Sequence, residues 1–293
     1  MARPAHPMRP GAPTKGTRVA DLSGLRVAVT GAGRGIGRSI ALRLAAAGAH
    51  LAVIDRDASR AEAVRAEVAA LGHPVLAVAG DVTRAADCTE MVRRTADGLG
   101  RLDVMVCNAG IVQVKPFLDI TEEDWDATFA VNVKGTFLTM QAAAARMRTQ
   151  EPLGAADDAD RTRPRGKIIT MSSIAGRYGA GAMAPLTPHY RASKASVISL
   201  TQTAAYALAP DITVNAICPG LVGTDMWRQI DQEWSATEGW TTGEAWKRRT
   251  AVVPMGRPQT PDDVAGLALY LCSPDSDYMT GQAVNIDGGL IMS

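Results

Sequence analysis

Residues 26–37 read RVAVTGAGRGIG, an apolar β-branched run followed at once by a glycine-rich turn and then by a helical pattern to residue 48. A strand-to-helix turn directs backbone N–H groups and the positive helix end toward one point, which suits a pyrophosphate. Glycine is needed there because a Cβ would hold the backbone away from the phosphates. The spacing G-x-x-x-G-x-G places glycines at 31, 35 and 37, whereas the common G-x-G-x-x-G would require a third glycine at Ile36.

The same alternation of apolar strand and longer helical pattern continues along the chain. Such βαβ repetition predicts an α/β fold, a single-domain Rossmann-type, doubly wound parallel sheet with helices on both faces. The expected strands are 26–30, 51–55, 75–79, 102–107, 167–171, 212–217 and 283–287, with helical patterns ending near 48, 71 and 99 and a long helix over about 187–208.

Three segments fall outside this alternation. Residues 1–23 hold four prolines and several basic residues but no apolar signal core, which predicts a disordered tail before a domain over 24–293; a targeting or partner-binding role is the alternative. Residues 150–166 are charged and rich in Pro and Gly, as expected of an exposed connection. Residues 221–256 read as a substrate-loop region that holds four of the five tryptophans.

Composition excludes several classes of protein. With 293 residues, 46% hydrophobic residues and a net charge of +1, the chain has no charge bias toward nucleic acid or an anionic membrane, and no apolar run reaches the roughly 20 residues of a membrane span. Four cysteines without a C-x-x-C pair indicate reduced thiols and therefore a cytoplasmic location. His6, His50 and His73 have no clustered partner, so no metal site is expected.

Asp55 ends the second expected strand. A carboxylate there can accept both ribose hydroxyls of an adenosine and repel a 2′-phosphate, which favours NAD over NADP. The alternative is a solvated aspartate at a helix start, given the neighbours Arg56 and Asp57. Arg34 and Arg56 would blunt the discrimination between the two cofactors.

Tyr190 and Lys194 lie four residues apart at the start of a helical pattern, so they share one helix face. Taken alone, such a pair is more often an ordinary surface pair. Here it follows Asn108-Ala109-Gly110, Asn132 in Val131-Asn132-Val133, and Ser173 in Met171-Ser172-Ser173, with Pro219-Gly220, Val222 and Thr224 after it.

This ordered set resembles the short-chain dehydrogenase/reductase family over about residues 22–293. The resemblance implies a catalytic set of Asn132, Ser173, Tyr190 and Lys194. It also implies an NAD-binding site made by Gly31, Arg34, Gly35, Ile36, Gly37, Asp55, Asp81, Val82, Asn108, Ala109, Gly110, Tyr190, Lys194, Pro219, Gly220, Val222 and Thr224.

The chemistry explains why these residue types occur together. Oxidation of a secondary alcohol needs a base within about 3 Å of the hydroxyl, and free tyrosine has a pKa near 10. Lowering that pKa by roughly 3 units requires about 4 kcal/mol, close to what one cation at about 4 Å supplies at an effective dielectric near 20, so we expect Lys194 to lower it. The resemblance further implies that Ser173 donates to the substrate oxygen, with Ser172 as the alternative donor, and that Asn132 holds a water that relays the proton.

Three details depart from the family pattern or stay open. Ser173 and Tyr190 are 17 residues apart, a longer spacing than usual, which we expect to reshape the pocket rim. Cys107 stands where the family often has asparagine and is interpreted as core packing. His189 either lines the pocket or begins the helix facing solvent.

The C-terminal part, especially 226–231 and 273–281, resembles acetoin reductase/butanediol dehydrogenases and sugar-alcohol dehydrogenases. We therefore expect a small diol, hydroxyketone or polyol as the alcohol/ketone substrate. The alternatives are a 3-oxoacyl-thioester reductase, against which Asp55 argues, and a catalytically silent nucleotide-binding protein. The tryptophan-rich segment would close over a ligand or pack against a neighbouring subunit. The resemblance implies a homotetramer or homodimer assembled through the long helices.

Overall fold

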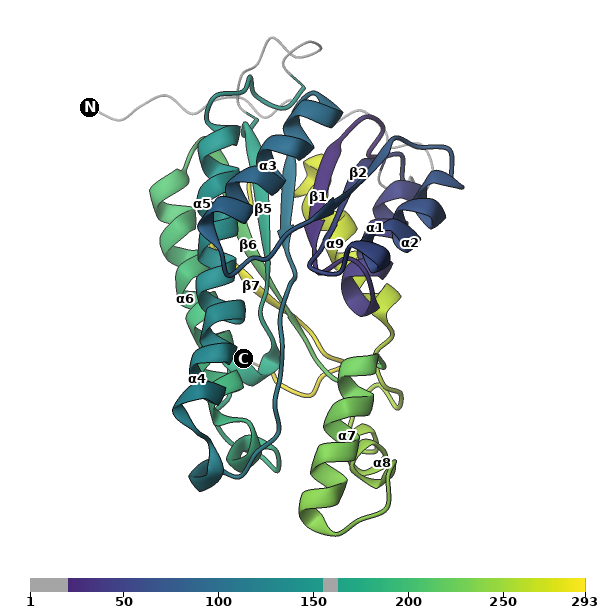
Figure 1. The fold of residues 1–293 in the computed structure, drawn as a ribbon, viewed down its shortest axis with the longest axis vertical. Helices are drawn as coiled ribbons and strands as arrows, with labels where there is room; N and C mark the ends of the chain where they lie inside the picture. The colour runs from purple at the N-terminus through teal and green to yellow at the C-terminus, as the bar shows by residue number, and fades with distance from the viewer. Residues whose placement is uncertain (1–20, 155–162, 293) are drawn as a thin grey trace, which may run out of the picture.

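Seven parallel strands form one sheet in the computed structural model, which describes residues 21–154 and 163–292 (Figure 1). The strand order is β3-β2-β1-β4-β5-β6-β7, so the chain builds outward from β1 and then returns beside it to build in the other direction. This confirms the predicted Rossmann-type, doubly wound sheet. The strands are β1 (Arg26–Thr30), β2 (His50–Asp55), β3 (Val75–Ala79), β4 (Val104–Cys107), β5 (Gly166–Met171), β6 (Ile212–Pro219) and β7 (Ala283–Ile286).

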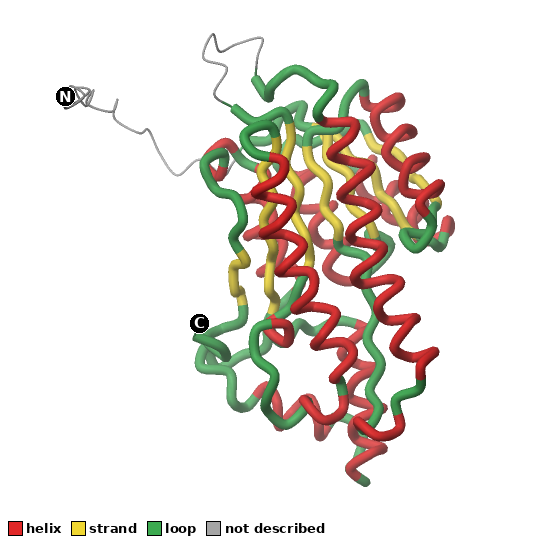
Figure 2. The backbone as a smooth tube through the Cα atoms, turned by 90° about the vertical axis from the view of Figure 1, so that its left-hand side faces the viewer, coloured by secondary structure: helices red, strands yellow, loops and turns green. Residues whose placement is uncertain are grey.

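Helices cover both faces of the sheet, and Figure 2 shows helices lying along the strands. The central strands are buried at every position, which explains their near-continuous apolar sequences. One core cluster joins the sheet to α1 (Gly35–Ala46), α2 (Ala58–Ala69) and α9 (Pro261–Cys272). A second joins its other face to α3 (Ala85–Leu99), α5 (Thr136–Met147) and α6 (Pro188–Leu208).

A helical stretch that the strand and helix patterns left unassigned follows β4. It comprises α4 (Glu122–Phe129), a π-helical segment (Ala130–Gly135) and α5. Thr121 and Asp124 form a capping box at its start, a signal that the sequence does carry. The π-helical segment interrupts the regular helix at the position of Asn132, which matters for the site below.

The tryptophan-rich segment is helical and is not a simple loop. It forms α7 (Asp225–Glu238) and α8 (Glu244–Thr250), which lie together beyond the end of the sheet in Figure 1. Ring centroids of Trp227 and Trp246 are 5.1 Å apart, and those of Trp234 and Trp240 are 5.9 Å apart. The tryptophans therefore first serve as the small core that holds α7 and α8 together.

The two predicted irregular segments are only partly described. Residues 1–20 of the tail and 155–162 of the connection lie outside the described residues. Leu22 is buried and its amide donates to Ala47 O over 2.8 Å, so packing begins two residues before the predicted domain start at 24. The flanks of the connection are anchored, because the Gln150 amide exchanges hydrogen bonds of 2.9 and 2.8 Å with the Leu102 backbone.

All four cysteines are free and buried, and Cys107 packs in the core as expected. Across the described ranges, no helix has the length and apolar character needed to cross a membrane. Within the same ranges, no three His, Cys, Asp or Glu side chains gather into a set that would hold a metal ion.

Candidate active site

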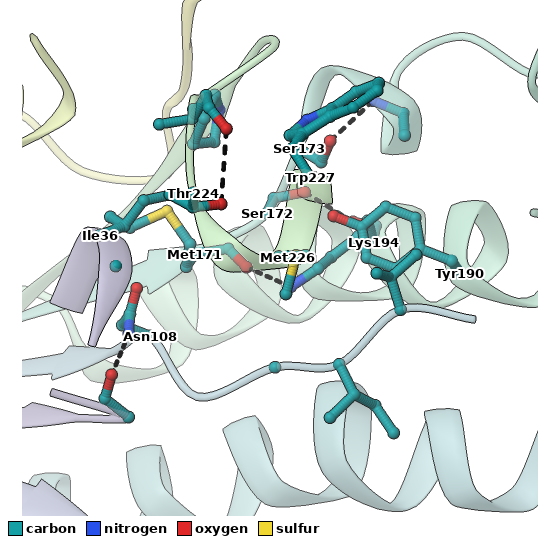
Figure 3. A pocket seen from close by; sticks show the side chains of 18 of the residues that line it. Ile36, Asn108, Met171, Ser172, Ser173, Tyr190, Lys194, Thr224, Met226 and Trp227 are labelled. Atoms are coloured by element: carbon teal, nitrogen blue, oxygen red, sulfur yellow. Dashed lines mark hydrogen bonds between the residues drawn. The ribbon is translucent and has the colours of Figure 1, made fainter. Parts of the chain in front are cut away.

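A cavity of about 610 Å³ opens at the carboxyl ends of the strands, where the strand order reverses between β1 and β4 (Figure 3). Ligands of doubly wound folds bind at this kind of crevice. Every residue that the sequence analysis assigned to the cofactor and catalytic sets lines this cavity, except Asn132. The fold thus brings segments separated by nearly 200 residues to one place.

The glycine turn lies between β1 and α1. Gly31 and Gly35 have φ angles of +62° and +56°, which disfavour side-chain-bearing residues. No side chain caps the first turn of α1, so its amides face the cavity without a competing protein acceptor. The Asn108 amide fixes the turn from behind, because its Nδ2 donates to Thr30 O and Gly31 O over 2.9 and 3.1 Å.

Gly37 is the glycine with the least space for a side chain. A Cβ at this position would lie 2.3 Å from Gly31 O and 2.5 Å from Asn108 Nδ2. We expect Gly37→Ala to lower the free energy of unfolding in urea by about 1–3 kcal/mol, as overpacking of a tight contact does. Gly266→Ala is the matched control: its Cβ meets nothing within 4 Å, so this change in the middle of α9 should stabilise by about 0.5–1 kcal/mol. Equal stability of parent and Gly37→Ala would contradict the close approach.

Asp55 lies at the end of β2 with both carboxylate oxygens engaged by the turn. Oδ2 accepts from Gly33 N over 2.9 Å and Oδ1 from Asp57 N over 3.0 Å. The helix-start aspartate is instead Asp57, which accepts from Ser59 N and Arg60 N to cap α2. Asp55 is therefore held at the cavity wall, and the solvated helix-cap interpretation applies to its neighbour.

The opposite wall of the cofactor end comes from β6 and the segment after it. Gly220 N donates to Ile286 O over 3.0 Å and to Gln259 Oε1 over 3.1 Å, which fixes this strand end. Thr224 precedes α7 and reaches across to the glycine turn, where its Cγ2 would lie 3.6 Å from a Cβ at Gly35. The cavity thus closes over the start of α1.

Tyr190, Lys194 and Ser173 line the other end of the cavity (Figure 3); Lys194 and Ser173 are buried and Tyr190 is partly buried. Tyr190 and Lys194 occupy successive turns of α6, and the Lys194 ammonium lies 5.8 Å from the tyrosine ring centroid. Ser173 follows β5; its Oγ accepts from Ala175 N over 3.1 Å, and its side chain acts to lower the pKa of Tyr190. Ser172 donates its hydroxyl to Lys194 O over 2.8 Å, so it ties β5 to α6, and Ser173 is the serine paired with the phenol.

Burial governs the protonation of this cluster. It raises the pKa of Tyr190, while the Ser173 hydrogen bond and the Arg191 charge act to lower it. It lowers the pKa of Lys194 to about 8, and Lys194 Nζ donates to Met171 O over 2.8 Å. The expected lowering of the Tyr190 pKa by Lys194 is not met here, because the ammonium is directed to a backbone carbonyl and burial disfavours both charged forms.

Asn132 lies one layer behind the cavity, fully buried in the π-helical segment. Its Nδ2 donates to Ile111 O over 2.9 Å and to Ser193 Oγ over 3.0 Å, and its Oδ1 accepts from Ile111 N over 2.9 Å. Gly110 separates it from Lys194: a Cβ there would meet Asn132 Oδ1 at 3.2 Å and Lys194 Nζ at 3.3 Å. The asparagine thus links the segment after β4 to α6.

His189 lies elsewhere than either sequence interpretation expected. It is fully buried, so it does not face solvent, and it does not line the cavity. Its two ring nitrogens have no hydrogen-bond partner among the described residues, and burial lowers its pKa. Asp124 acts to raise this pKa and Lys115 to lower it, but burial is the larger effect.

Several cavity residues were not found from the sequence. Met226 and Trp227 line the wall from α7, so the tryptophan-rich segment contributes one ring to the site. Arg191 and Arg249 reach the wall from α6 and α8. Arg191 directly follows Tyr190, a positional signal, whereas Arg249 is 59 positions from Tyr190 and only the fold reveals its place.

The sequence is similar to those of several known dehydrogenases and reductases. The family model described as enoyl-(acyl carrier protein) reductase matches residues 31–291. L-2,3-butanediol dehydrogenase of Corynebacterium glutamicum is 41% identical over 90% of this chain and 97% of its own. Galactitol 2-dehydrogenase of Agrobacterium fabrum is also 41% identical, over 90% of this chain and 96% of its own. A 3-oxoacyl-[acyl-carrier-protein] reductase of Synechocystis is 35% identical over 90% and 96% of the two chains.

Solved structures agree with these relatives. A short-chain type dehydrogenase/reductase from Mycobacterium marinum superposes with a TM-score of 0.80 at 37% identity, covering 93% of this chain and 98% of that one. A 7α-hydroxysteroid dehydrogenase complexed with NADH superposes with a TM-score of 0.78 at 30% identity, covering 93% and 96%.

Proposed function

Because this chain belongs to the short-chain dehydrogenase/reductase family, we propose that it interconverts a secondary alcohol and its ketone by hydride transfer with NAD⁺ or NADH. The substrate class is a small diol, hydroxyketone or polyol, as the names of the relatives suggest. The observation that carries the proposal is the Ser173–Tyr190–Lys194 cluster, because it shares one cavity with the uncapped start of α1.

The cavity fits a dinucleotide in chemistry as well as in place. The open first turn of α1 suits a pyrophosphate. Asp55, held at the end of β2, suits the ribose hydroxyls of NAD and disfavours a 2′-phosphate. Asp81 and Val82 after β3, Asn108 to Gly110 after β4, and Pro219 to Thr224 after β6 complete the walls. The NADH-bound steroid dehydrogenase with the same fold supports this choice.

A bound nicotinamide would accept or supply the hydride, and side chains of the protein transfer the proton. We propose that Tyr190 Oη takes the hydroxyl proton during oxidation and returns it during reduction. Ser173 lines the same cavity and acts on that phenol, and we propose that its hydroxyl donates to the same substrate oxygen. Met226 and Trp227 cover the site from α7 and limit access of water.

We propose that Lys194 and Asn132 take part in proton transfer and do not bind the substrate. Lys194 is buried with a pKa of about 8, so it can hold or release a proton near neutral pH. Asn132 sits across Gly110 from it and fixes Ile111 and Ser193 around it. We propose that together they pass the Tyr190 proton toward solvent through a water.

A second candidate is reduction of a 3-oxoacyl thioester. The Synechocystis relative and the description of the family model favour it. Asp55 argues against this function, because thioester reductases usually use NADPH and a carboxylate at this position disfavours the 2′-phosphate. A catalytically silent nucleotide-binding protein would have no need for the complete catalytic set.

We also propose that the protein acts in the cytoplasm as a homotetramer or homodimer. Exposed aromatic side chains on the outer faces of α5 and α6, Phe137 and Tyr206, support assembly through these helices.

The direct test is turnover with NAD⁺ or NADP⁺ on a panel of diols, polyols, simple secondary alcohols and hydroxyacyl thioesters, followed by absorbance of the reduced nicotinamide. We expect NAD⁺-dependent oxidation of a diol or polyol. Turnover confined to NADP⁺ and a thioester would replace the first proposal by the second.

A further inference from the structure

Two arginines meet at the reacting end of the cavity from separate elements. Arg191 follows Tyr190 on α6, and Arg249 lies in the last turn of α8. Both line the cavity, together with Met183 and Val252. Tyr190 and Arg191 are adjacent in α6, and Tyr190, Arg191 and Arg249 all line this one cavity. The charge of Arg249 also acts on Arg191, and that of Arg191 on Tyr190.

These two cations lack a carboxylate partner. Within residues 21–154 and 163–292, neither guanidinium forms an ion pair, and the Nε atoms of both are buried without a hydrogen-bond partner. The Arg191 guanidinium donates to Tyr178 O, a neutral acceptor. Asp225, the acidic residue that lines the wall nearby in the chain, is paired with Arg228.

The neighbouring Arg248 does not line the cavity and is fully partnered on the surface of α8. It donates to Glu244 over 2.8 Å and stacks on Trp240 at 4.2 Å from the ring centroid. Arg249 instead lines the cavity as a partly buried cation, and among the described residues it forms no ion pair. Burial lowers the pKa of both Arg191 and Arg249, which means that each charged form is held at a cost.

An anion between the two guanidiniums would remove that cost. Guanidinium groups bind carboxylate and phosphate oxygens through paired N–H donors. The cofactor pyrophosphate belongs at the start of α1, and the arginines that line the adenosine end are Arg34, Arg56 and Arg60. The pair Arg191 and Arg249 therefore remains for the substrate.

We propose that Arg191 and Arg249 bind an oxyanion group, a carboxylate or a phosphate, on the alcohol or ketone substrate of this enzyme. This inference rests on the proposed oxidoreductase function and adds an anionic group to the small alcohol or ketone proposed as its substrate. The anionic group anchors one end of the substrate and leaves the hydroxyl-bearing carbon beside Tyr190 and Ser173. The preferred substrate is thus a hydroxy acid or phosphorylated polyol rather than a neutral diol.

The test compares substrates that differ only in the anion. Butane-1,2-diol and butane-1,3-diol are measured against 2-hydroxybutanoate and 3-hydroxybutanoate, and against the 1-phosphates of both diols, with NAD⁺. We expect kcat/KM to be higher for one anionic series than for its neutral counterpart, and the better series identifies carboxylate or phosphate.

Arg249→Gln is the decisive variant, because Arg191 also influences Tyr190 and would alter every substrate. The ratio of kcat/KM for the anion to kcat/KM for the diol should fall about 10- to 100-fold in Arg249→Gln, mainly through KM, as loss of a charge-assisted hydrogen bond predicts. Arg248→Gln is the control and should keep the parent ratio. A parent that prefers the diols, with the same ratio in Arg249→Gln, would overturn the inference and leave the proposed function intact.

A binding measurement tests the anion site separately from the proposed oxidoreductase function. Calorimetric titration of the protein with butanoate, butanamide and inorganic phosphate should show binding of butanoate or phosphate but not of the neutral amide, and Arg249→Gln should lose it. Anion binding without turnover of any alcohol would refute the proposed function while supporting the site. Diol turnover with equal affinity for butanoate and butanamide would refute the site alone.

Discussion

Tyr190→Phe should lower kcat for oxidation of the preferred alcohol by about 10²–10⁴-fold, the range that general acid–base catalysis contributes. The change removes one oxygen from a buried ring and leaves α6, Lys194 and the cavity wall in place. Affinity for NADH, measured by nucleotide fluorescence, should change little. Tyr270→Phe is the matched control, because Tyr270 lies on α9, is exposed and does not line the cavity. A Tyr190→Phe enzyme as active as the parent would remove tyrosine from the mechanism.

The pH dependence of the same reaction gives an independent reading of Tyr190. Burial raises its pKa, and Arg191 opposes that rise. Alcohol oxidation needs the phenolate as base, so the rate should increase with pH until the phenol is ionised. With a neutral diol, Arg191→Gln removes a cation that favours the phenolate, and the rising limb should move to higher pH. A rising limb at the same pH in Arg191→Gln as in the parent would show that Arg191 does not act on the phenol.

The sheet and the cofactor end of the site were predictable because they depend on local patterns. A buried parallel strand is a continuous apolar run, and the turn at Gly31 to Gly37 needs glycine for backbone reasons visible in the sequence. Asp55 was assigned for the same reason: it ends a strand at the edge where ligands bind. For these residues, the position along a strand or turn in the sequence also determines the position in the folded protein.

The reacting end of the site was predicted less completely because its details arise from packing. The π-helical segment around Asn132 has no periodicity of its own, and the helices α7 and α8 were hidden by a high content of tryptophan that suggested a binding loop. The direction of the Lys194 ammonium toward Met171 O also depends on the distance between β5 and α6. The spacing of residues in the sequence does not predict such contacts between separate elements.

Arg249 illustrates the same limit for specificity. In the sequence it is one of three consecutive basic residues, Lys247 to Arg249, within the predicted substrate-loop region, and no pattern distinguishes it from the other two. The packing of α8 against α7 turns Arg248 toward Glu244 and Arg249 toward the cavity. The proposed anion site therefore depends on an element, α8, that the sequence pattern leaves undefined.

Asp55→Asn should raise the ratio of kcat/KM with NADP⁺ to kcat/KM with NAD⁺ by about 10²–10³-fold. Two unit charges about 4 Å apart interact by about 4 kcal/mol at an effective dielectric near 20, and each 1.4 kcal/mol is tenfold. The amide can keep an acceptor for Gly33 N, so the turn should persist while the repulsion of a 2′-phosphate is lost. Arg34 and Arg56 line the same end and can then pair with that phosphate.

Asp57→Asn provides the control for Asp55→Asn, because Asp57 caps α2 and does not line the cavity. It should leave the cofactor ratio unchanged even if the helix cap is weakened. A parent enzyme that prefers NADP⁺, or an Asp55→Asn ratio equal to the parent's, would mean that the cations at this end outweigh the carboxylate. Cofactor choice would then be decided by the balance of Arg34 and Arg56 against Asp55, and the hydrogen bonds that Asp55 accepts from Gly33 and Asp57 would be its main role.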